Sequence, residues 1–445
     1  MAFNVGLLGL GTVGAGTADI LLNPSGRHPL LKDVRLHRVG VRSLDKSRAV
    51  QLPADCLTTD LSAIVSDPEV DIVVEVIGGI EPARTLVLEA LSQGKHVVTA
   101  NKALIARHGE EIFAAAKSAG VYVLLEAAVG GGIPVIEPLK HSLCANRIRA
   151  ITGIVNGTTN YILTRMQQEG GDFDVILADA QRLGYAEADP TADVDGLDAA
   201  DKISILAGLA FGGRVDLADI HCQGIRQVSA ADVAYAERLS FVVKLLAIAT
   251  RDEQGSGEQI QVRVHPALVP QQHPLASVSG VYNAILVEGE PVGQVMFYGP
   301  GAGAGPTASA VVADILNVAA LLKLGHSGVT TAAGTPPLDP LLAPTYSHTW
   351  AVTPVSELKT RFYVRLLAKD RPGVIGRLGS GFGDHNVSLE SVVQIGMRNE
   401  LAEIVVITHE VREGNAMAAL AQIRNDEAIA AVPSVLRVLS VQPSS

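Results

Sequence analysis

The feature that most constrains the fold is a glycine pattern directly after the first apolar run. Residues 3–8 are apolar enough for a buried strand, and residues 9–14 then read GLGTVG. A plausible helix follows at 15–22. The spacing G-x-G-x-x-G between a strand and a helix is typical of the turn that holds a dinucleotide pyrophosphate at a helix N-terminus. We therefore predict an α/β domain of the Rossmann type at the start of the chain.

Each position in this turn has a physical role. Gly9 permits the tight turn, Gly11 lets the backbone approach a pyrophosphate, and Gly14 lets helix and strand pack closely. Thr12 and Val13 lie between these glycines at the helix start, so we expect all five residues to contact the cofactor. A glycine-rich turn without a ligand is the alternative interpretation of the same pattern.

The charge after the second expected strand bears on the choice of cofactor. That strand covers 34–41 and is followed by Arg42, where NAD-preferring sites usually carry an acid for the ribose hydroxyls. Arg42, with Lys46 and Arg48 beyond it, favours a 2′-phosphate and hence NADP(H). Asp45 lies nearby, so use of NAD(H) stays open, and a solvated loop charge is the other interpretation of Arg42.

Strands and helices continue to alternate up to residue 125, which indicates βαβ units and a parallel sheet. The expected elements are a strand at 71–77, a helix at 81–93, a strand at 96–99, a helix at 103–119 and a strand at 121–125. Loops after such strands bind ligands. Thr99 and Lys102 stand in one of these loops, and we expect both at the cofactor. An ordinary solvated lysine is the alternative for Lys102.

Composition limits the class of protein. The 445 residues include 48% apolar and 18% charged residues, which is typical of a globular protein of two or three domains. The net charge of -11 and pI of about 5.6 argue against nucleic acid or an anionic membrane as a partner. Cys56, Cys144 and Cys222 have no short spacing and suit a reducing cytoplasm. No apolar run reaches about 18 residues, so no membrane span is expected.

Residues 126–134 read EAAVGGGIP, a glycine-rich bend that exposes carbonyl oxygens beside Glu126. Such a bend suits either a hard monovalent cation or a hinge between domains, and the spacing alone favours the hinge. Residues 154–160 then join a strand to a helix, where amides and hydroxyls cap the helix or bind a carboxylate.

A second glycine-rich helix start occurs late in the chain. Residues 299–307 read GPGAGAGPT and precede an apolar helix at 308–323. The position indicates that the chain returns to the cofactor domain near the nicotinamide, so we expect Gly303 at the cofactor. Strands at 259–264, 283–287 and 292–298 predict an α+β middle domain with a mostly antiparallel sheet.

An acidic run ends on a single lysine. Six carboxylates lie within fifteen residues, namely Glu187, Asp189, Asp193, Asp195, Asp198 and Asp201. Asp198 and Lys202 are four apart in a predicted helix and share one face. An EF-hand register would put Thr191 at its first position and Lys202 at its last, and both are wrong for calcium. A magnesium site stays open, but proton handling fits better, because a charged lysine can relay a proton to a carbonyl oxygen.

These motifs together resemble the homoserine dehydrogenase family over about residues 1–330. The segments that carry the resemblance are GLGTVG at 9–14, TANK at 99–102, EAAVGGGIP at 126–134, NGTTNYI at 156–162, LGYAEADPTADVDGLDAADK at 183–202 and GPGAGAGPTASAVVADI at 299–315. The family reduces L-aspartate 4-semialdehyde to L-homoserine with NAD(P)H, in threonine, methionine and isoleucine biosynthesis.

The resemblance implies roles for individual side chains. Lys202 would be the catalytic acid/base, with Lys102 as a second active-site lysine. Asp198 would orient the substrate, and Glu187 would bind its amino end. The substrate carboxylate would suit the main-chain amides of Gly157 and Thr158.

The resemblance also implies a sodium site, which takes precedence over the hinge interpretation. It would consist of Glu126 with the carbonyl groups of Val129, Gly131 and Ile133.

The last part of the chain has a pattern of its own. Residues 324–360 are rich in Gly, Pro, Ser and Thr, which indicates a linker. From residue 361 the order strand, helix, strand, strand, helix, strand is ferredoxin-like. The segment LAKDRPGV at 367–374 resembles the start of an ACT domain. That resemblance implies a threonine effector site at Asp370, Gly373, Val374 and Asn386, and a pure dimerisation module is the alternative.

The sequence thus predicts a Rossmann domain at 1–135, completed by the helix at about 303–323, and an α+β catalytic and dimerisation domain at 136–302. The linker at 324–360 and an ACT βαββαβ domain at 361–440 follow. We expect a cytoplasmic, monofunctional homodimer or homotetramer without nucleic-acid or membrane partners. Two other functions stay open: a nucleotide or amino-acid sensor without turnover, and an NADP oxidoreductase acting on another small aldehyde.

Overall fold

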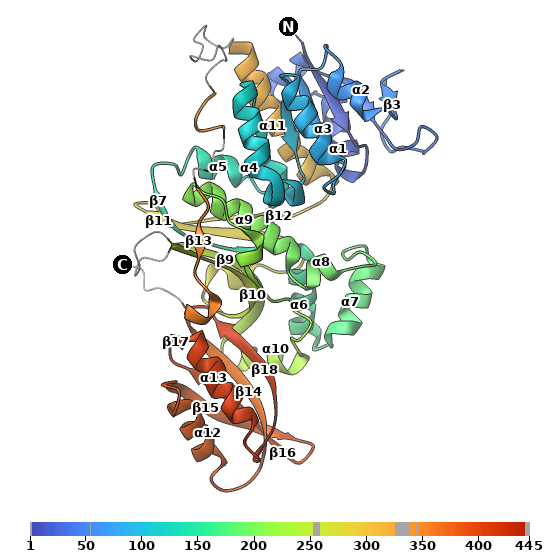
Figure 1. The fold of residues 1–445 in the computed structure, drawn as a ribbon. Helices are drawn as coiled ribbons and strands as arrows, with labels where there is room; N and C mark the ends of the chain where they lie inside the picture. The colour runs from blue at the N-terminus through green and yellow to red at the C-terminus, as the bar shows by residue number, and fades with distance from the viewer. Residues whose placement is uncertain are drawn as a thin grey trace. The chain divides into compact units, whose positions relative to one another are not determined.

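The computed structural model describes residues 2–53, 55–251, 259–324, 338–343, 346 and 348–440 (Figure 1). The chain divides into two compact units. Unit 1 consists of Met1–Ile151, Asp201–Leu217 and Asn283–Trp350, and unit 2 consists of Thr152–Ala200, Ala218–Tyr282 and Ala351–Ser445. This division cuts across the domain boundaries expected from the sequence, and those boundaries stay a prediction.

A six-stranded parallel sheet forms the centre of unit 1. Its strands are β1 (Phe3–Leu8), β2 (Val34–Gly40), β3 (Leu57–Thr58), β4 (Ile72–Glu75), β5 (His96–Thr99) and β6 (Val123–Leu124). The order is β3-β2-β1-β4-β5-β6, and all neighbouring pairs are parallel. This is the strand order of the Rossmann fold, which confirms the predicted fold class.

Helices flank this sheet in unit 1. They are α1 (Thr12–Leu22), α2 (Leu61–Ser66), α3 (Ala83–Ser92), α4 (Lys102–Ala119), α5 (Ile136–Lys140) and α11 (Ala304–Leu324). Helix α11 packs against α1, and its residues Val311, Ile315 and Val318 belong to the same apolar core as β1. By length and composition α11 would suffice to cross a membrane, but half of that stretch is buried inside the protein.

Three further strands follow the order β12-β11-β7. They are β7 (Arg147–Ile154), β11 (Tyr282–Glu290) and β12 (Gly293–Pro300). The strands expected at 283–287 and 292–298 are confirmed as parts of β11 and β12. Strand β7 begins in unit 1 and ends in unit 2.

Unit 2 carries the acidic run on short helices. Its helices are α6 (Gly157–Glu169), α7 (Phe173–Arg182), α8 (Thr191–Val194) and α10 (Ala230–Arg238), and α9 (Leu197–Phe211) starts here and continues into unit 1. Strands β8 (His221–Cys222), β9 (Phe241–Arg251), β10 (Gln259–Pro270) and β13 (Ala351–Val352) accompany them. Strand β9 pairs antiparallel with β10, whereas β8 and β13 pair parallel with it. The middle sheet is therefore mixed rather than mostly antiparallel.

The C-terminal part of unit 2 is ferredoxin-like. It comprises β14 (Lys359–Lys369), α12 (Val374–Gly383), β15 (Leu389–Arg398), β16 (Leu401–Thr408), β17 (Val411–Arg412), α13 (Glu413–Arg424) and β18 (Ile429–Val438). The strand order β18-β14-β16-β15, with α12 and α13 packed side by side, confirms the predicted ACT topology (Figure 1). Strand β18 also pairs parallel with β10. The short β17 was not predicted.

The expected linker is packed where it is described. Residues 325–337 lie outside the described residues, so that part of the prediction has no structural counterpart here. Leu338 and Leu342 pack against the core of unit 1, and β13 pairs with β10 in unit 2. The extent of the linker stays a prediction.

A buried ion cluster attaches the ACT sheet to helix α10 within unit 2. Arg365 on β14 is 2% exposed; its Nε donates to Asp232 Oδ1 at 2.7 Å, and its Nη1 donates to Glu403 Oε1 at 2.9 Å. Removing one partner from such a cluster typically costs about 3–5 kcal/mol, because an uncompensated buried charge remains.

Candidate active site

The glycine turn after β1 is shaped by close backbone contacts. Gly9 has a φ of 105°, in the region that favours glycine. A Cβ on Gly14 would lie 2.1 Å from the carbonyl oxygen of Gly9, so only glycine fits where helix α1 crosses the turn. A Cβ on Gly11, in contrast, would meet nothing within 4 Å. The protein thus leaves open space beside Gly11, as a turn that admits a pyrophosphate requires.

The start of α1 is suited to an anion. Gly11 is its N-cap and offers no side chain, and the first turn contains no acidic residue. The first main-chain N–H groups of the helix are thus left to a ligand, which is how dinucleotide pyrophosphates are bound. The turn with Thr12 and Val13 at the helix start fits the predicted cofactor.

The second glycine-rich helix start lies against the first. A Cβ on Gly16 of α1 would come within 2.7 Å of the carbonyl oxygen of Ala304, the first residue of α11. Gly303 precedes it with a φ of 121° and is exposed. The structure therefore brings Gly303 to the helix that carries the GLGTVG turn.

Arg42 stands directly beyond β2 and is exposed. Within the described part of the chain it makes no ion pair or hydrogen bond. Arg48 instead folds back on the loop, where its guanidinium donates to the carbonyl groups of Leu44 and Lys46. The loop is thus held by Arg48, and Arg42 is left to meet a ligand.

A buried carboxylate organises the loops after β4 and β5, and the sequence analysis did not find it. Glu75 is fully buried at the end of β4; its Oε1 accepts from the main-chain N–H of Ile77, and its Oε2 accepts from Thr99 Oγ1 at 2.6 Å. Thr99 Oγ1 accepts from the N–H of Asn101, which caps α4 through Leu104 N. The Thr99 side chain is therefore used inside the protein, and only its main chain can reach a cofactor.

The two lysines predicted at the site lie on helices that contact each other. Lys102 is the first residue of α4, and Lys202 is 9% exposed on α9. Arg107 Nη1 on α4 donates to Asp201 Oδ1 on α9 at 2.9 Å. This pair joins the two helices one residue before Lys202 and five residues after Lys102.

Asn156 connects the acidic run to the start of α6. Its Nδ2 donates to Asp193 Oδ1 at 2.7 Å and to Asp198 Oδ2 at 2.9 Å. Its Oδ1 accepts from the N–H of Thr159 at 2.9 Å and so caps α6. The sequence analysis placed Asn156 in a helix-start motif but did not predict this bridge.

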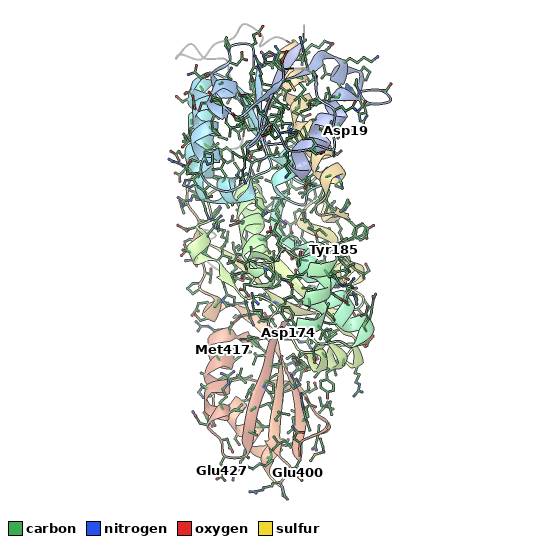
Figure 2. The ribbon with its side chains drawn as sticks, turned by 90° about the vertical axis from the view of Figure 1, so that its right-hand side faces the viewer. Asp19, Asp174, Tyr185, Glu400, Met417 and Glu427 are labelled. Atoms are coloured by element: carbon green, nitrogen blue, oxygen red, sulfur yellow. The ribbon has the colours of Figure 1, made fainter. Side chains whose placement is uncertain are left out.

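The predicted substrate residues lie around the same helix start. Gly157 and Thr158 form the first turn of α6, where main-chain N–H groups have no partner within the helix. Thr158 Oγ1 donates to the carbonyl oxygen of Tyr185, which Figure 2 labels. Glu187 is exposed two residues later, and its carboxylate makes no hydrogen bond or ion pair with the described residues.

The other acids of the run hold the local structure. Asp189 accepts from Thr191 N, Asp193 from Asn156, Asp195 from Arg226 and Asp201 from Arg107. All four carboxylates are therefore bonded to groups of the protein itself.

A buried lysine on the sheet forms a hydrogen bond with α6. Lys244 on β9 is 2% exposed, and its Nζ donates to Asn160 Oδ1 and to the carbonyl oxygen of Val278. Burial lowers the pKa of Lys244 to about 8. It therefore fixes α6 to the sheet, and sequence patterns gave no indication of it.

The 126–134 bend is suited to a cation, because several of its carbonyl oxygens accept no hydrogen bond from the described residues. The carbonyl oxygens of Val129, Gly131 and Ile133 are in buried residues, and no donor in the described chain bonds to them. An unpaired buried carbonyl is costly, and a hard cation would satisfy it. The Glu126 carboxylate itself accepts three main-chain N–H groups, from residues 135–137.

Asp314 brings a second buried carboxyl group to this bend. Its Oδ2 accepts from the N–H of Glu126, and its Oδ1 is buried without a partner among the described residues. Burial raises the pKa of Asp314 well above its usual value, and the neighbouring Glu126 raises it further. Burial likewise raises the pKa of Glu126.

The ACT part has a separate cavity of about 420 Å³ at the start of α12. Asp370, Gly373 and Val374 line it, together with Gln394 of β15. Asn386 is not part of this lining, because it lies just beyond the opposite end of α12. The structure thus brings together three of the four predicted effector residues, and the polar Gln394 on a strand was missed.

Family comparisons agree with this arrangement. A family model described as "Homoserine dehydrogenase, NAD binding domain" matches residues 9–126. One described as "Homoserine dehydrogenase" matches residues 134–316, and one described as "ACT domain" matches residues 362–428.

Relatives match over nearly the whole chain. A homoserine dehydrogenase of Synechocystis sp. is 62% identical over 440 residues, which is 99% of this chain and 100% of the relative. That of Bacillus subtilis is 42% identical over 441 residues, 98% of each. Among solved structures, a homoserine dehydrogenase from Thiobacillus denitrificans matches with a TM-score of 0.88 at 44% identity, covering 99% and 98% of the two chains. A hyperthermophilic archaeal homoserine dehydrogenase in complex with NADPH matches with a TM-score of 0.61 at 28% identity, covering 73% and 98%.

Proposed function

The chain belongs to the homoserine dehydrogenase family, and on that premise we propose that it reduces L-aspartate 4-semialdehyde to L-homoserine with NAD(P)H. The observation that carries the proposal is the double anchoring of α9. Asn156 holds Asp198 on this helix, and Arg107 holds Asp201 next to Lys202. A sensor without turnover has no need to fix a buried lysine in this way.

Two lysines carry out the proton chemistry in our proposal. Bound NAD(P)H supplies the hydride to the aldehyde carbon. Lys202 donates a proton to the aldehyde oxygen as negative charge develops there, and Lys102 stabilises that charge. Burial of Lys202 strengthens these interactions, because little water screens them.

Carboxylates and amides hold the two ends of the substrate. Glu187 and Asp198 bind the ammonium group; Glu187 is exposed, and Asp198 is oriented by Asn156. The main-chain N–H groups of Gly157 and Thr158 at the start of α6 bind the carboxylate. Opposite charges at the two ends select a zwitterion over a simple aldehyde.

We propose NADP(H) as the preferred cofactor, with NAD(H) also used. Exposed Arg42 beyond β2 supports this preference, and a related archaeal homoserine dehydrogenase was solved with NADPH. Arg42→Ala should lower kcat/KM for NADPH about tenfold or more and change that for NADH little, and Lys32→Ala, an exposed lysine before β2, serves as the control. An equal loss with both cofactors would contradict the role of Arg42.

We propose Na⁺ at the 126–134 bend, bound by carbonyl oxygens of the segment and close to Glu126. The unpaired oxygens of Val129, Gly131 and Ile133 support it. The bend packs closely against Gly301, since a Cβ on Gly131 would lie 2.4 Å from the Gly301 carbonyl oxygen. A bound cation would stabilise the bend in this position. Activity and thermal stability should rise with NaCl more than with tetramethylammonium chloride.

Threonine inhibition through the ACT part is a further proposal. The cavity beside Asp370, Gly373 and Val374 supports it. Gly376 lines the cavity, and a Cβ there would meet nothing within 4 Å, so we expect Gly376→Phe to fold and to obstruct the cavity. This variant should keep its activity and lose inhibition by threonine.

A homodimer or homotetramer in the cytoplasm completes the proposal. Strand β15 ends the sheet order and exposes Val393 and Met397, which supports pairing with a second copy. Cys56, Cys144 and Cys222 form no disulfide with one another, which suits a reducing compartment. Sedimentation measurements would give the oligomeric state.

One assay tests the proposed reaction. Purified protein with L-aspartate 4-semialdehyde and NADPH should lose absorbance at the NADPH band, and L-homoserine should form. No turnover in either NaCl or KCl would overturn the proposal in favour of a sensor. Turnover with another small aldehyde alone would show a different oxidoreductase.

A further inference from the structure

A second cavity lies in unit 2, away from the start of α12. Its volume is about 180 Å³, and it is bounded by strand β18, by the segment 223–228 and by helix α13. Met417 of α13, labelled in Figure 2, is part of its wall. Apolar side chains such as Val228 and Leu436 share the lining with polar groups.

The charged residues of this lining are two arginines and one glutamate. Arg437 is 7% exposed and is paired with Glu413, which is 4% exposed. Its Nη1 also donates to Gln223 Oε1 at 3.0 Å. Arg424, at the end of α13, is exposed and forms no ion pair with any described residue, so its guanidinium is available to a ligand at the rim of the cavity.

Two further basic side chains, His221 and Arg263, lie near Arg437. Arg437 Nη2 lies 3.0 Å from His221 Nε2, and Arg263 is close enough to influence the same histidine. Arg263 Nε is buried without a hydrogen-bond partner in the described chain. Burial, and to a smaller extent Arg437, lowers the pKa of Arg263 to about 10. Asp219 shares a smaller recess with Arg263 on the outer side.

We propose that this cavity binds a small organic anion, a carboxylate with a short apolar part such as an amino acid. The carboxylate lies at Arg424 and Arg437, and the apolar part lies against Val228 and Leu436. Arg424 forms no ion pair with a described residue, and Arg437 shares the lining with it, so a carboxylate in the cavity would meet two guanidinium groups. The site is separate from the ACT cavity at Asp370–Gly376, with which it shares no lining residue.

One wall of the cavity is also a support of the acidic run. Ile225 N donates to the carbonyl oxygen of Val194, and Arg226 Nε donates to Asp195 Oδ1. A Cβ on Gly224 would lie 2.1 Å from the Val194 carbonyl oxygen, so the two backbone segments are in close contact. A ligand that packs against Gln223 and Gly224 would therefore shift or stabilise the neighbouring acidic segment. In that segment, Asp193 accepts a hydrogen bond from Asn156.

The binding test uses a charge reversal at the cavity wall. Gln227 lines the cavity, is exposed and makes no hydrogen bond with described residues, so its replacement leaves the fold intact. Calorimetric titration of the full chain with L-threonine, L-aspartate and acetate should show binding that Gln227→Glu weakens at least tenfold. Gln227→Lys should preserve or strengthen it. L-Threonine amide, which lacks the carboxylate, should bind far more weakly.

Gly376→Phe separates this site from the ACT cavity. In that variant the Gln227-dependent binding should persist. If all binding is lost in Gly376→Phe, or if Gln227→Glu and Gln227→Lys bind every probe as the wild type does, the proposal is wrong. Absence of binding by all three carboxylates would overturn it too.

The kinetic consequence rests on the proposed function. A bound carboxylate should change KM for L-aspartate 4-semialdehyde by about threefold or more, and Gln227→Glu should remove the change. Calorimetry does not need turnover, so a protein that binds these probes but does not oxidise NADPH would disprove the proposed function alone.

Discussion

Arg107 Nη1 donates to Asp201 Oδ1 at 2.9 Å, and this pair joins α4, which begins at Lys102, to α9 one residue before Lys202. The contact therefore sets the relative position of the two helices that carry both proposed catalytic lysines. Arg107 is a positioning residue, since its own side chain is used by Asp201.

Removing this contact should affect turnover more than binding. Arg107→Ala should lower kcat about tenfold with little change in KM for NADPH. Without the Arg107–Asp201 contact, α4 and α9 are no longer held together, and Lys102 and Lys202 lose their fixed relative position. Arg107→Lys should restore part of the rate. Steady-state kinetics measures both, and an unchanged kcat in Arg107→Ala would contradict the positioning role.

Lys202→Ala should lower kcat by about 10²-fold or more, the usual scale of lost general-acid catalysis. Lys117→Ala, in the last turn of α4, is the matched control and should behave as the wild type. Circular dichroism of both variants shows whether they fold. A folded Lys202→Ala protein with near-normal kcat would exclude Lys202 as the acid.

The two glycines of the cofactor turn should fail in different ways. Gly11→Ala meets no protein atom, so its melting temperature should match the wild type while KM for NADPH rises tenfold or more. Gly14→Ala places a Cβ 2.1 Å from the Gly9 oxygen, so its melting temperature should fall as well. Thermal melts with and without NADPH distinguish the two. Equal melting temperatures of the two variants would show that the turn tolerates a side chain at position 14.

Asn156→Ala should raise KM for the semialdehyde about tenfold and leave KM for NADPH unchanged. The variant leaves Asp193 and Asp198 without their common donor and uncaps α6. Loss of an N-cap alone costs about 1 kcal/mol, so Asp60→Ala, which removes the side-chain cap of α2, is a control for general destabilisation. A similar KM effect in the control would remove the specific role of Asn156.

Lys244 should make stability depend on alkaline pH. Its pKa is about 8 in the folded protein and about 10.4 in an unfolded chain. Between these values the unfolded chain binds a proton that the folded chain does not, so stability gains up to about 1.4 kcal/mol per pH unit as pH rises. Urea unfolding at pH 7.5 and 9.5 should show this gain in the wild type and not in Lys244→Met. Parallel behaviour of the two proteins, or of the wild type and Lys244→Gln, would contradict it.

Local patterns were enough to predict most elements of the cofactor domain, although β3 and α2 were not predicted. The GLGTVG turn specifies its own strand and helix, and β1 and β5 have the predicted bounds. Helix α1 begins three residues earlier than expected, because Thr12 already follows the N-cap Gly11. Helix boundaries depend on capping by neighbouring groups, which apolar periodicity does not report.

The contacts that organise the site were not visible in the sequence. Glu75 reads as one more strand residue, yet it connects β4 to Thr99, 24 positions away. Arg365 and Asp232 are 133 positions apart and meet only because β14 packs on α10. Pairs of this kind follow from tertiary packing, which a single sequence does not specify. Asn156 is an intermediate case, since its position before a helix predicted a cap but not its bridge to Asp198.

The contact between Gly16 and the first turn of α11 has a consequence for the history of the chain. A Cβ at position 16 would meet Ala304 O at 2.7 Å and the Ala308 Cβ at 3.0 Å. Residues nearly three hundred positions apart are thus bound to change together: a larger side chain at 16 is admissible only in a lineage whose α11 has moved away. Across related sequences, positions 16 and 308 should covary in volume, and this covariation would mark which members keep the two helix starts joined.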